Sequence, residues 1–281
     1  MRHVEAAPAK INLSLRVLGK REDGFHEIET LMTAVDGVAD GLGFDLEVRE
    51  GDIELRCDDP ELPTGPENLV LRAVSVFEQA ADVRFAGQIN LEKRIPSGAG
   101  LGGGSSDAAA VLRALDVIAG AGLGEGRLGE LAAEIGSDVP FFIRGEPAWC
   151  RGRGEVIERY EGVVPRTSIV LAKPAFGVAS AWAYQHWAGS AGLPGVDYAS
   201  QAAPWGEAVN DLERPVFEKY LVLPTLKGWL GARAETELAL MSGSGATVFA
   251  TLRDGEGGDA LLEDLRAEFG ESTWAKVAAI G

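Results

Sequence analysis

Several residue types are scarce in this sequence, and each shortage excludes a class of protein. Only two of the 281 residues are cysteines, Cys57 and Cys150, and their wide separation matches no metal-binding spacing. A disulfide framework and a zinc site are therefore disfavoured, and a reducing compartment is indicated. No apolar run approaches the ~18 residues of a membrane span, and residues 1–5 lack the apolar stretch of a signal peptide. We therefore expect a cytoplasmic protein without a membrane partner.

Basic residues are also scarce relative to acidic ones. The sequence has 26 lysines and arginines but 43 aspartates and glutamates, so the formal net charge is −17. A field of that sign repels nucleic acid and anionic membranes, so neither is an expected partner. The hydrophobic fraction of 46% and the charged fraction of 25% are ordinary for a soluble globular enzyme. An anionic substrate would need a local pocket of positive charge and backbone amides.

The order of the predicted elements indicates the fold class. Apolar and polar side chains alternate in several segments, as they do in half-buried strands, and a turn at residues 50–52 predicts a hairpin between the strands on either side of it. Apolar residues at helical spacing predict helices. The predicted strands cover residues 11–17, 44–48, 53–57, 89–93, 167–172, 238–241, 247–252 and 274–280. The predicted helices cover about residues 68–77, 108–119, 127–135, 179–187, 223–230 and 261–269.

Strands followed by mixed elements, without strict βαβ alternation, indicate an α+β fold in two lobes. At ~150 residues per domain, the length allows one large domain or two modest ones. We place the boundary in the loop near residues 152–166, which divides the chain into an N-terminal domain of residues 1–160 and a C-terminal domain of residues 161–281.

A glycine-rich loop carries the strongest functional signal. Five of the seven residues from Gly98 to Gly104 are glycine, and two serines then open an amphipathic helix. Glycines let the backbone approach a ligand closely, and the helix N-terminus adds partial positive charge, so the loop is a predicted phosphate cradle. The serine hydroxyls can bind phosphate or a magnesium ion. The predicted binding residues are Pro96, Ser97, Gly98, Ala99, Gly100, Leu101, Gly102, Gly103, Gly104, Ser105 and Ser106.

Two familiar nucleotide-binding patterns fit this loop poorly. Gly98, Gly100 and Gly103 satisfy the dinucleotide pattern, but the loop follows charged residues rather than a buried strand, and no acidic strand end lies ~20 residues further on. The Walker pattern fails because no Gly-Lys-Ser/Thr is present. A flexible surface loop is the remaining alternative, but it requires neither this glycine density nor the two serines.

Four shorter segments carry possible chemistry. Lys10 and Asn12 lie on the same face of a strand, two residues apart. Residues 23–27 form a turn with an aromatic residue and a histidine, and residues 136–142 set a carboxylate between a helix end and an apolar strand. A second glycine turn covers residues 242–245. Taken alone, each segment is explained at least as well by a solvated turn or strand end, and the second glycine turn becomes informative only if it packs against the first loop.

Taken together and in this order, the segments resemble the GHMP kinase superfamily. The resemblance rests on the Pro-Ala-Lys-Ile-Asn-Leu strand (residues 8–13), the glycine loop (96–106) and the Ser-Gly-Ser-Gly turn (242–245). Within the superfamily it is closest to the members that phosphorylate 4-diphosphocytidyl-2-C-methyl-D-erythritol, on residues 21–26, 136–142 and 210–213 among others. The matching stretches span nearly the whole chain.

The resemblance implies a fold, an activity and a catalytic pair. The implied fold joins a ribosomal protein S5 domain 2-like N-terminal lobe to a ferredoxin-like C-terminal lobe. The implied reaction transfers the γ-phosphoryl of ATP, with Mg²⁺, to the C2 hydroxyl of the cytidylyl alcohol in the methylerythritol phosphate route to isoprenoid precursors. Asp138 matches the catalytic base and Lys10 the lysine that supports it. Ser105 is the predicted magnesium ligand, with Glu130 as a second choice.

The resemblance also implies a site for the small-molecule substrate. Phe25 and Tyr184 match an aromatic pair that stacks the cytosine base, and His26 matches the histidine that binds its polar edge. Phe25 stands where tyrosine is often found, which keeps the stacking surface but removes a hydroxyl. The predicted substrate-binding residues are Asn12, Phe25, His26, Asp138, Tyr184, Gly243 and Ser244.

Three alternatives stay open alongside this interpretation. They are a GHMP kinase for another alcohol, a non-catalytic nucleotide-binding protein on the same scaffold, and a nicotinamide-dependent dehydrogenase. We expect a monomer or a weak homodimer.

Overall fold

Two long strands at the N-terminus form an antiparallel ribbon on which the rest of the sheet is built. The structure is a computed structural model that describes residues 2–253 and 257–281. The elements of the first half are β1 (Arg2–Lys20), β2 (His26–Val48), β3 (Ile53–Cys57), α1 (Leu69–Ala81), β4 (Phe85–Glu92), α2 (Gly103–Ala119), α3 (Gly124–Ile135), α4 (Phe141–Arg144), β5 (Ala148–Gly152) and β6 (Val156–Arg159).

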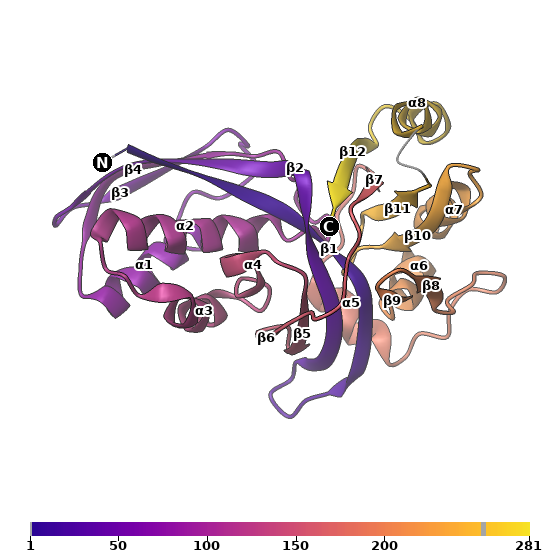
Figure 1. Ribbon diagram of the computed structural model, residues 1–281, viewed down its shortest axis with the longest axis horizontal. Helices are drawn as coiled ribbons and strands as arrows, with labels where there is room; N and C mark the ends of the chain where they lie inside the picture. The colour runs from indigo at the N-terminus through magenta and orange to yellow at the C-terminus, as the bar shows by residue number, and fades with distance from the viewer. Residues whose placement is uncertain (1, 254–256) are drawn as a thin grey trace.

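The described residues of the second half form a further six strands and four helices. Its elements are β7 (Thr167–Lys173), α5 (Ser180–Trp187), β8 (Gln201–Ala203), β9 (Gly206–Ala208), α6 (Glu213–Lys219), α7 (Val222–Gly231), β10 (Thr236–Met241), β11 (Val248–Leu252), α8 (Gly258–Phe269) and β12 (Trp274–Ile280). In Figure 1 the β1–β2 ribbon bends downward between α1–α4 on the left and α6–α8 on the right. The predicted boundary after residue 160 falls between β6 and β7.

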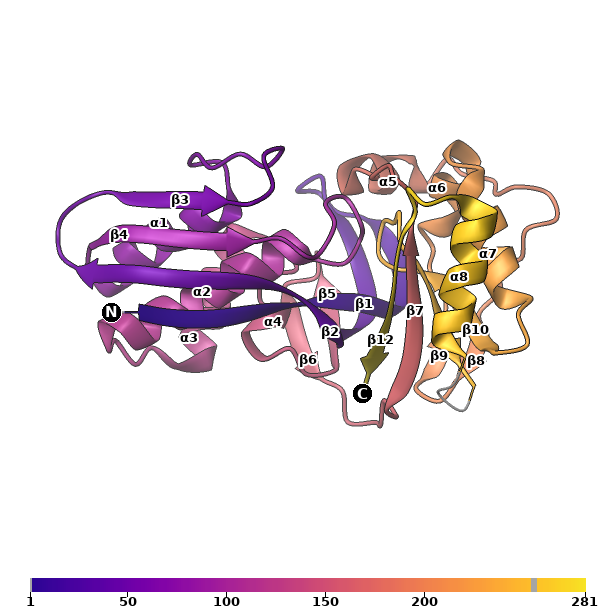
Figure 2. The same ribbon diagram turned by 90° about the horizontal axis from the view of Figure 1, so that it is seen from above.

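One sheet runs through both halves of the chain. Its strand order is β10-β11-β7-β12-β2-β4-β3, with β1 and β5 also paired to β2, and β6 paired to β5. The predicted hairpin between residues 44–48 and 53–57 is wrong, because β4 lies between β2 and β3 and pairs in parallel with β3. The turn at residues 50–52 reverses the chain but leaves room for one strand between β2 and β3. After the crossover through α1, β4 fills that space, and Figure 2 shows it lying beside β3. Ile89 and Leu91 of β4 are buried.

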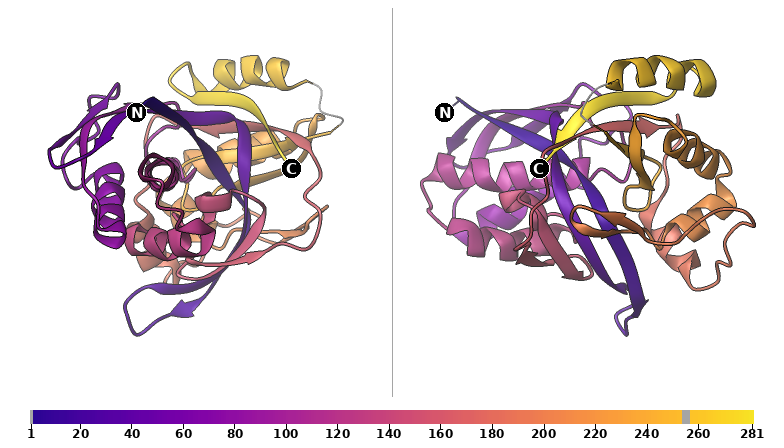
Figure 3. Two further views of the ribbon diagram at one scale, coloured as in Figure 1. Left: turned by 60° about the vertical axis from the view of Figure 1, so that its left-hand side comes forward. Right: turned by 45° about the vertical axis from the view of Figure 1, so that its right-hand side comes forward.

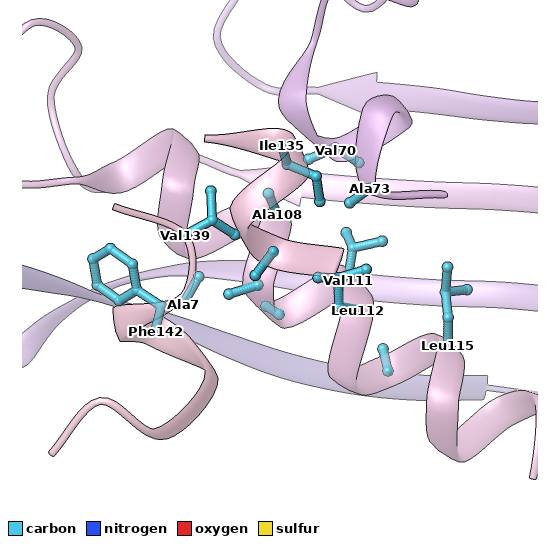
Figure 4. Packing of buried hydrophobic residues seen from close by; sticks show 14 of the residues in the cluster. Ala7, Val70, Ala73, Ala108, Val111, Leu112, Leu115, Ile135, Val139 and Phe142 are labelled. Atoms are coloured by element: carbon cyan, nitrogen blue, oxygen red, sulfur yellow. The ribbon is translucent and has the colours of Figure 1, made fainter. Parts of the chain in front are cut away.

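The helices α1, α2 and α3 pack against one another on one face of the N-terminal strands, where the predicted helices are confirmed. Asn68 caps α1 by accepting a hydrogen bond from the Val70 amide at 2.9 Å. Ala108, Val111, Leu112 and Leu115 of α2 are fully buried and form the centre of this core. Figure 4 shows these side chains facing residues of α1, α3 and α4.

Some elements differ from the prediction. Residues 141–144 form the short helix α4 rather than a strand, because Pro140 has a helical φ of −58° and Gly145 ends the turn in the left-handed region at φ +72°. The structure also contains β5, β6, α6 and the two short strands β8 and β9, none of which the sequence pattern predicts. The α+β class is confirmed. Figure 3 shows the C-terminal strands and helices gathered on the far side of the ribbon. Across the described ranges, no helix is both long and apolar enough to span a bilayer.

Candidate active site

The lysine and the aspartate singled out in the sequence lie side by side. The Lys10 Nζ is 3.6 Å from the Asp138 Oδ2, although 127 residues separate them in the chain. The Lys10 side chain is only 4% exposed, whereas that of Asp138 is 37% exposed. The carboxylate is thus open to a ligand, and the ammonium behind it is shielded from water.

Asn12 fixes the direction of the Lys10 ammonium. Lys10 Nζ donates to the Asn12 Oδ1 at 2.6 Å, and the Asn12 Nδ2 donates to the Thr30 Oγ1 at 2.8 Å. The Thr30 hydroxyl donates in turn to the Ser14 carbonyl at 2.6 Å. Because both ends of the Asn12 amide are engaged, its oxygen is held toward the lysine.

Asp138 lies in the turn between α3 and α4. Val139 and Phe141 on either side of Pro140 are buried, and the Val139 amide donates to the Gly136 carbonyl at 3.3 Å. Gly154 packs closely on the carboxylate, since a Cβ added there would be 3.6 Å from the Asp138 Oδ1. The turn is therefore anchored by apolar burial, and its one carboxylate lies beside the Lys10 ammonium.

The glycine loop ends beside the same lysine. Gly98, Gly100 and Gly102 all have φ between +60° and +74°, a region that other residues rarely adopt. The Lys10 amide donates to the Leu101 carbonyl at 2.9 Å, and a Cβ on Gly102 would be 3.1 Å from the Lys10 Cγ. The loop therefore leads the N-terminus of α2, with its partial positive charge, to the neighbourhood of Lys10.

The second glycine turn packs against the first, which answers the question its sequence left open. The Ser242 hydroxyl donates to the Gly100 carbonyl at 3.0 Å, and the Thr247 amide donates to the Ala99 carbonyl at 3.1 Å. Gly243 lies next to the catalytic candidates, because a Cβ there would be 3.2 Å from the Lys10 Nζ. Ser244 shares a hydrogen bond of 2.8 Å with Ser180.

The predicted base-binding residues are brought together only in part. The rings of His26 and Tyr184 stack with centroids 5.6 Å apart at 26°, and His26 also meets Trp187 edge-on at 6.2 Å. Phe25 is 50% exposed, and its described ring contact is with the guanidinium of Arg153, 4.9 Å from the ring centroid. The structure thus places His26, rather than Phe25, against Tyr184.

Burial sets the titration of this aromatic group. It lowers the pKa of His26, and the Lys20 charge lowers it further, so the imidazole is neutral at neutral pH. Burial raises the pKa of Tyr184, and the nearby Asp138 charge adds to that effect, so the phenol keeps its proton. Both rings are therefore uncharged hydrogen-bonding groups.

Sequence reasoning missed several residues that shape the site. Asn210 donates to the carbonyls of Met241 and Gly243, both at 2.7 Å, and so holds the second glycine turn in place. Its only signal was the Asn-Asp-Leu-Glu stretch that carried part of the resemblance. Arg153, whose guanidinium lies over the Phe25 ring, has no role that the sequence predicts. Trp187, beside His26, carried no signal at all.

A magnesium ion would depend on few protein ligands. Among the residues that the structure describes, no group of three or more histidine, cysteine, aspartate or glutamate side chains could hold a metal. Mg²⁺ commonly uses one or two protein oxygens together with substrate phosphates and water. Ser105 fits this role, because it lies in the first turn of α2 and is only partly buried. Glu130 is exposed on α3 and pairs with Arg127 at 2.6 Å.

Comparison with known proteins decides the family. Residues 68–146, which include the glycine loop and Asp138, match the family described as GHMP kinases N terminal domain. The chain is 38% identical over 278 residues to the 4-diphosphocytidyl-2-C-methyl-D-erythritol kinase of Methylacidiphilum infernorum, with 98% of this chain and 95% of that protein covered. It is 39% identical to the kinase of the same name from Syntrophotalea carbinolica, with 96% of each covered. The chain belongs to the 4-diphosphocytidyl-2-C-methyl-D-erythritol kinase family.

Solved structures agree with this kinase family. A crystal structure of 4-(cytidine 5'-diphospho)-2C-methyl-D-erythritol kinase matches with a TM-score of 0.75 and 35% identity, covering 99% of this chain and 100% of that one. The mevalonate kinase of Methanococcus jannaschii, at 13% identity and a TM-score of 0.64 over 100% of this chain and 99% of that one, shares the fold alone. The expected superfamily is confirmed: the chain is a small-molecule kinase with the GHMP kinase fold, a class that uses ATP as phosphate donor.

Proposed function

We propose that this kinase transfers the γ-phosphoryl of ATP to the C2 hydroxyl of 4-diphosphocytidyl-2-C-methyl-D-erythritol, in the methylerythritol phosphate route to isoprenoid precursors. The observation that carries the proposal is the pairing of Lys10 with Asp138 at 3.6 Å beside the glycine loop. It is supported by relatives of that name that match almost the whole chain.

In this mechanism Asp138 is the general base. Its exposed carboxylate accepts the proton of the C2 hydroxyl while the hydroxyl oxygen attacks the γ-phosphorus and ADP leaves. The Lys10 ammonium attracts the negative charge that develops on the attacking oxygen and the phosphoryl group. Because phosphoryl transfer depends mainly on positioning and charge stabilisation, a rigid lysine held by Asn12 suits the reaction.

The triphosphate lies, in this proposal, along the glycine loop. Backbone amides of residues 98–106 and the N-terminus of α2 provide its positive potential. When bound, Mg²⁺ neutralises charge on the phosphates, and the Ser105 hydroxyl would be a protein ligand. Ser106 is buried in the same turn and its hydroxyl has no partner among the described residues, so it is better placed to support the loop than to meet solvent ions.

The cytidine end is assigned to the aromatic group on the other side of Lys10. His26 is neutral and stacked on Tyr184, so it can exchange hydrogen bonds with the edge of a pyrimidine. Phe25, with half of its surface exposed beneath Arg153, offers a face on which a base can stack. Asn12, Gly243 and Ser244 are the proposed contacts to the rest of the substrate: Asn12 and Gly243 lie next to the Lys10 ammonium, and Ser244 hydrogen-bonds Ser180 on the helix that carries Tyr184.

Substitution of Asp138 tests the proposal. We expect Asp138→Asn to lower the turnover number by on the order of 10²–10⁴ while ATP affinity is kept, because a carboxamide cannot accept the proton. The matched control is Asp264→Asn, which removes an exposed carboxylate on α8 and should leave turnover unchanged. Near-normal turnover by Asp138→Asn would reject the assignment of the base.

A second measurement tests the substrate. ATP consumption is compared with the cytidylyl alcohol, mevalonate, homoserine and galactose as acceptors. We expect only the cytidylyl alcohol to be phosphorylated efficiently, because the other acceptors carry no base for the aromatic group. Preference for another acceptor would overturn the substrate and leave the family assignment intact. A cytoplasmic location, the two-domain division and a monomeric or weakly dimeric state remain predictions.

A further inference from the structure

Lys173, the last residue of β7, is a buried cation that pairs with no acid. It is 6% exposed, and its Nζ donates to the carbonyls of Pro174 at 3.1 Å and Phe176 at 3.0 Å. Among the described residues no carboxylate lies within ion-pair distance of this ammonium. Burial lowers the pKa of Lys173, in keeping with a charge compensated by backbone dipoles alone.

Other poorly exposed lysines of the chain contact carboxylates. Lys93 contacts Asp40 and Asp107, and Lys227 contacts Glu213. Burying an ammonium without an opposite charge is costly, and a strand end could carry an apolar residue instead. The Lys173 ammonium therefore serves to bind the backbone carbonyls of the segment that follows it, those of Pro174 and Phe176.

That chain, residues 174–179, is named here the strap. The Val178 amide in the strap donates to the Gly98 carbonyl at 3.2 Å. Backbone packs on backbone at the same point, because a Cβ on Gly98 would be 2.9 Å from the Gly177 Cα. The C-terminal part of the strap is thus in direct contact with the glycine loop.

Directly after these contacts the strap continues into α5, which carries residues of the proposed cytidine site. Ser180 hydrogen-bonds Ser244 of the second glycine turn, and Tyr184 stacks on His26. Midway, Phe176 stacks on Tyr220 with ring centroids 4.8 Å apart at 11°, which fixes the strap to the end of α6. A single short segment therefore touches the proposed sites of both substrates.

We propose that Lys173 is a positioning residue that couples the binding of the two substrates by holding the strap in the one conformation that serves both sites. This rests on the proposed function of those sites. Phosphate on the glycine loop orders the Gly98 carbonyl, which orders the strap and then α5. A cytidine nucleotide orders the same segment through α5. Each ligand thus lowers the cost of binding the other, and the coupling is reciprocal.

The experiment measures this coupling by titration calorimetry. The dissociation constant of cytidine diphosphate is measured with and without a saturating non-hydrolysable ATP analogue and Mg²⁺. The proteins are the wild type, Lys173→Met, Lys173→Arg and a control, Lys276→Met, which removes an exposed lysine from the neighbouring strand β12. We expect the analogue to tighten cytidine diphosphate binding about fivefold or more in the wild type.

In Lys173→Met that factor should fall to about one, while Lys173→Arg and Lys276→Met keep it. Such a change in coupling is not produced by a residue that only stabilises the fold. A second variant, Gly177→Ala, reaches the same contact without touching the lysine, since its Cβ would be 3.1 Å from the Gly98 Cα. It should lose coupling too, and it keeps the test intact if Lys173→Met does not fold.

The outcomes separate the two proposals. If cytidine diphosphate binds but the wild type shows no coupling, or Lys173→Met and Gly177→Ala retain it, the role of Lys173 is overturned and the proposed substrate stands. If the wild type binds the ATP analogue but not cytidine diphosphate, the proposed substrate fails and the inference fails with it.

Discussion

Replacement of Gly100 by alanine tests whether the two glycine turns form one unit. Gly100 has a φ of +74°, and a Cβ added there would be 2.2 Å from the Ser242 carbonyl oxygen and 3.0 Å from that of Gly245. Ordinary non-bonded contacts begin at about 3.5 Å. The two turns must therefore separate by about 1 Å to admit one methyl group.

The cost follows from two contributions. An L-residue in the left-handed region costs about 1–2 kcal/mol. The contacts that join the turns, from the Ser242 hydroxyl to Gly100 and from the Thr247 amide to Ala99, are worth about 1 kcal/mol each. We expect a loss of about 3–4 kcal/mol in the free energy of unfolding. Because Gly243 and Lys10 move with the turns, a misplacement of about 1 Å should also lower kcat/KM about 10²-fold.

Urea denaturation and steady-state kinetics measure the two effects. The matched control is Gly129→Ala on α3, where an added Cβ has no atom within 4 Å and the backbone is helical. The control should gain up to about 1 kcal/mol, because alanine favours helix over glycine, and should keep its kcat/KM. A Gly100→Ala variant as stable and as active as this control would show that the turns do not depend on each other.

Two further predictions concern the buried acid near the loop and the aromatic face. Burial raises the pKa of Asp107 to about 7, and Asp40 raises it while Lys93 lowers it. Between about pH 4 and pH 7 the unfolded chain releases this proton and the folded chain keeps it, so the free energy of unfolding falls as pH rises. The Tm of Asp107→Asn minus the Tm of the wild type should therefore be higher at about pH 8 than at about pH 5. A Tm difference that does not change with pH would contradict this. Phe25→Ala should raise KM for the cytidylyl substrate about 10–100-fold, since stacking of a base is worth ~1–3 kcal/mol, and leave KM for ATP unchanged; an equal rise in both would remove Phe25 from the cytidine site.

Local patterns predicted the elements well and their pairing poorly. The helix at Asn68 was recognisable because its cap and its apolar spacing are local properties. The hairpin failed because alternation shows that residues 53–57 form a strand but not which strand lies beside it. The strand beside β3 is β4, which follows β3 in the chain after a crossover through α1. Residues 141–144 failed for a related reason, since a short apolar run is equally compatible with a buried helix and a buried strand.

The sequence predicted which residues belong to the site but not how their side chains are arranged. Lys10, Asp138 and the two glycine turns were identified by residue type and order, and the structure brings them together. The partner of Tyr184 could not be identified, because Phe25 and His26 are adjacent aromatic residues and the sequence does not show which of the two rings meets α5. Lys173 could not be identified from the sequence, because what distinguishes it is its burial without a carboxylate partner among the described residues, and that is a property of the folded structure.

A break in the central ribbon explains why the site forms where it does. β1 and β2 pair regularly until Pro8 opposes Ala39, and the next pair is Ala9 with Val35, so residues 36–38 leave the ladder. Asp36, released in this way, pairs with Ala279 of β12, which joins the C-terminal strands to the sheet. The break lies one residue before Lys10, so the point at which the two halves of the sheet meet is also the point from which the ammonium projects. Interruptions of this kind re-aim side chains beside active sites, and this one lies next to the residue whose ammonium meets Asp138.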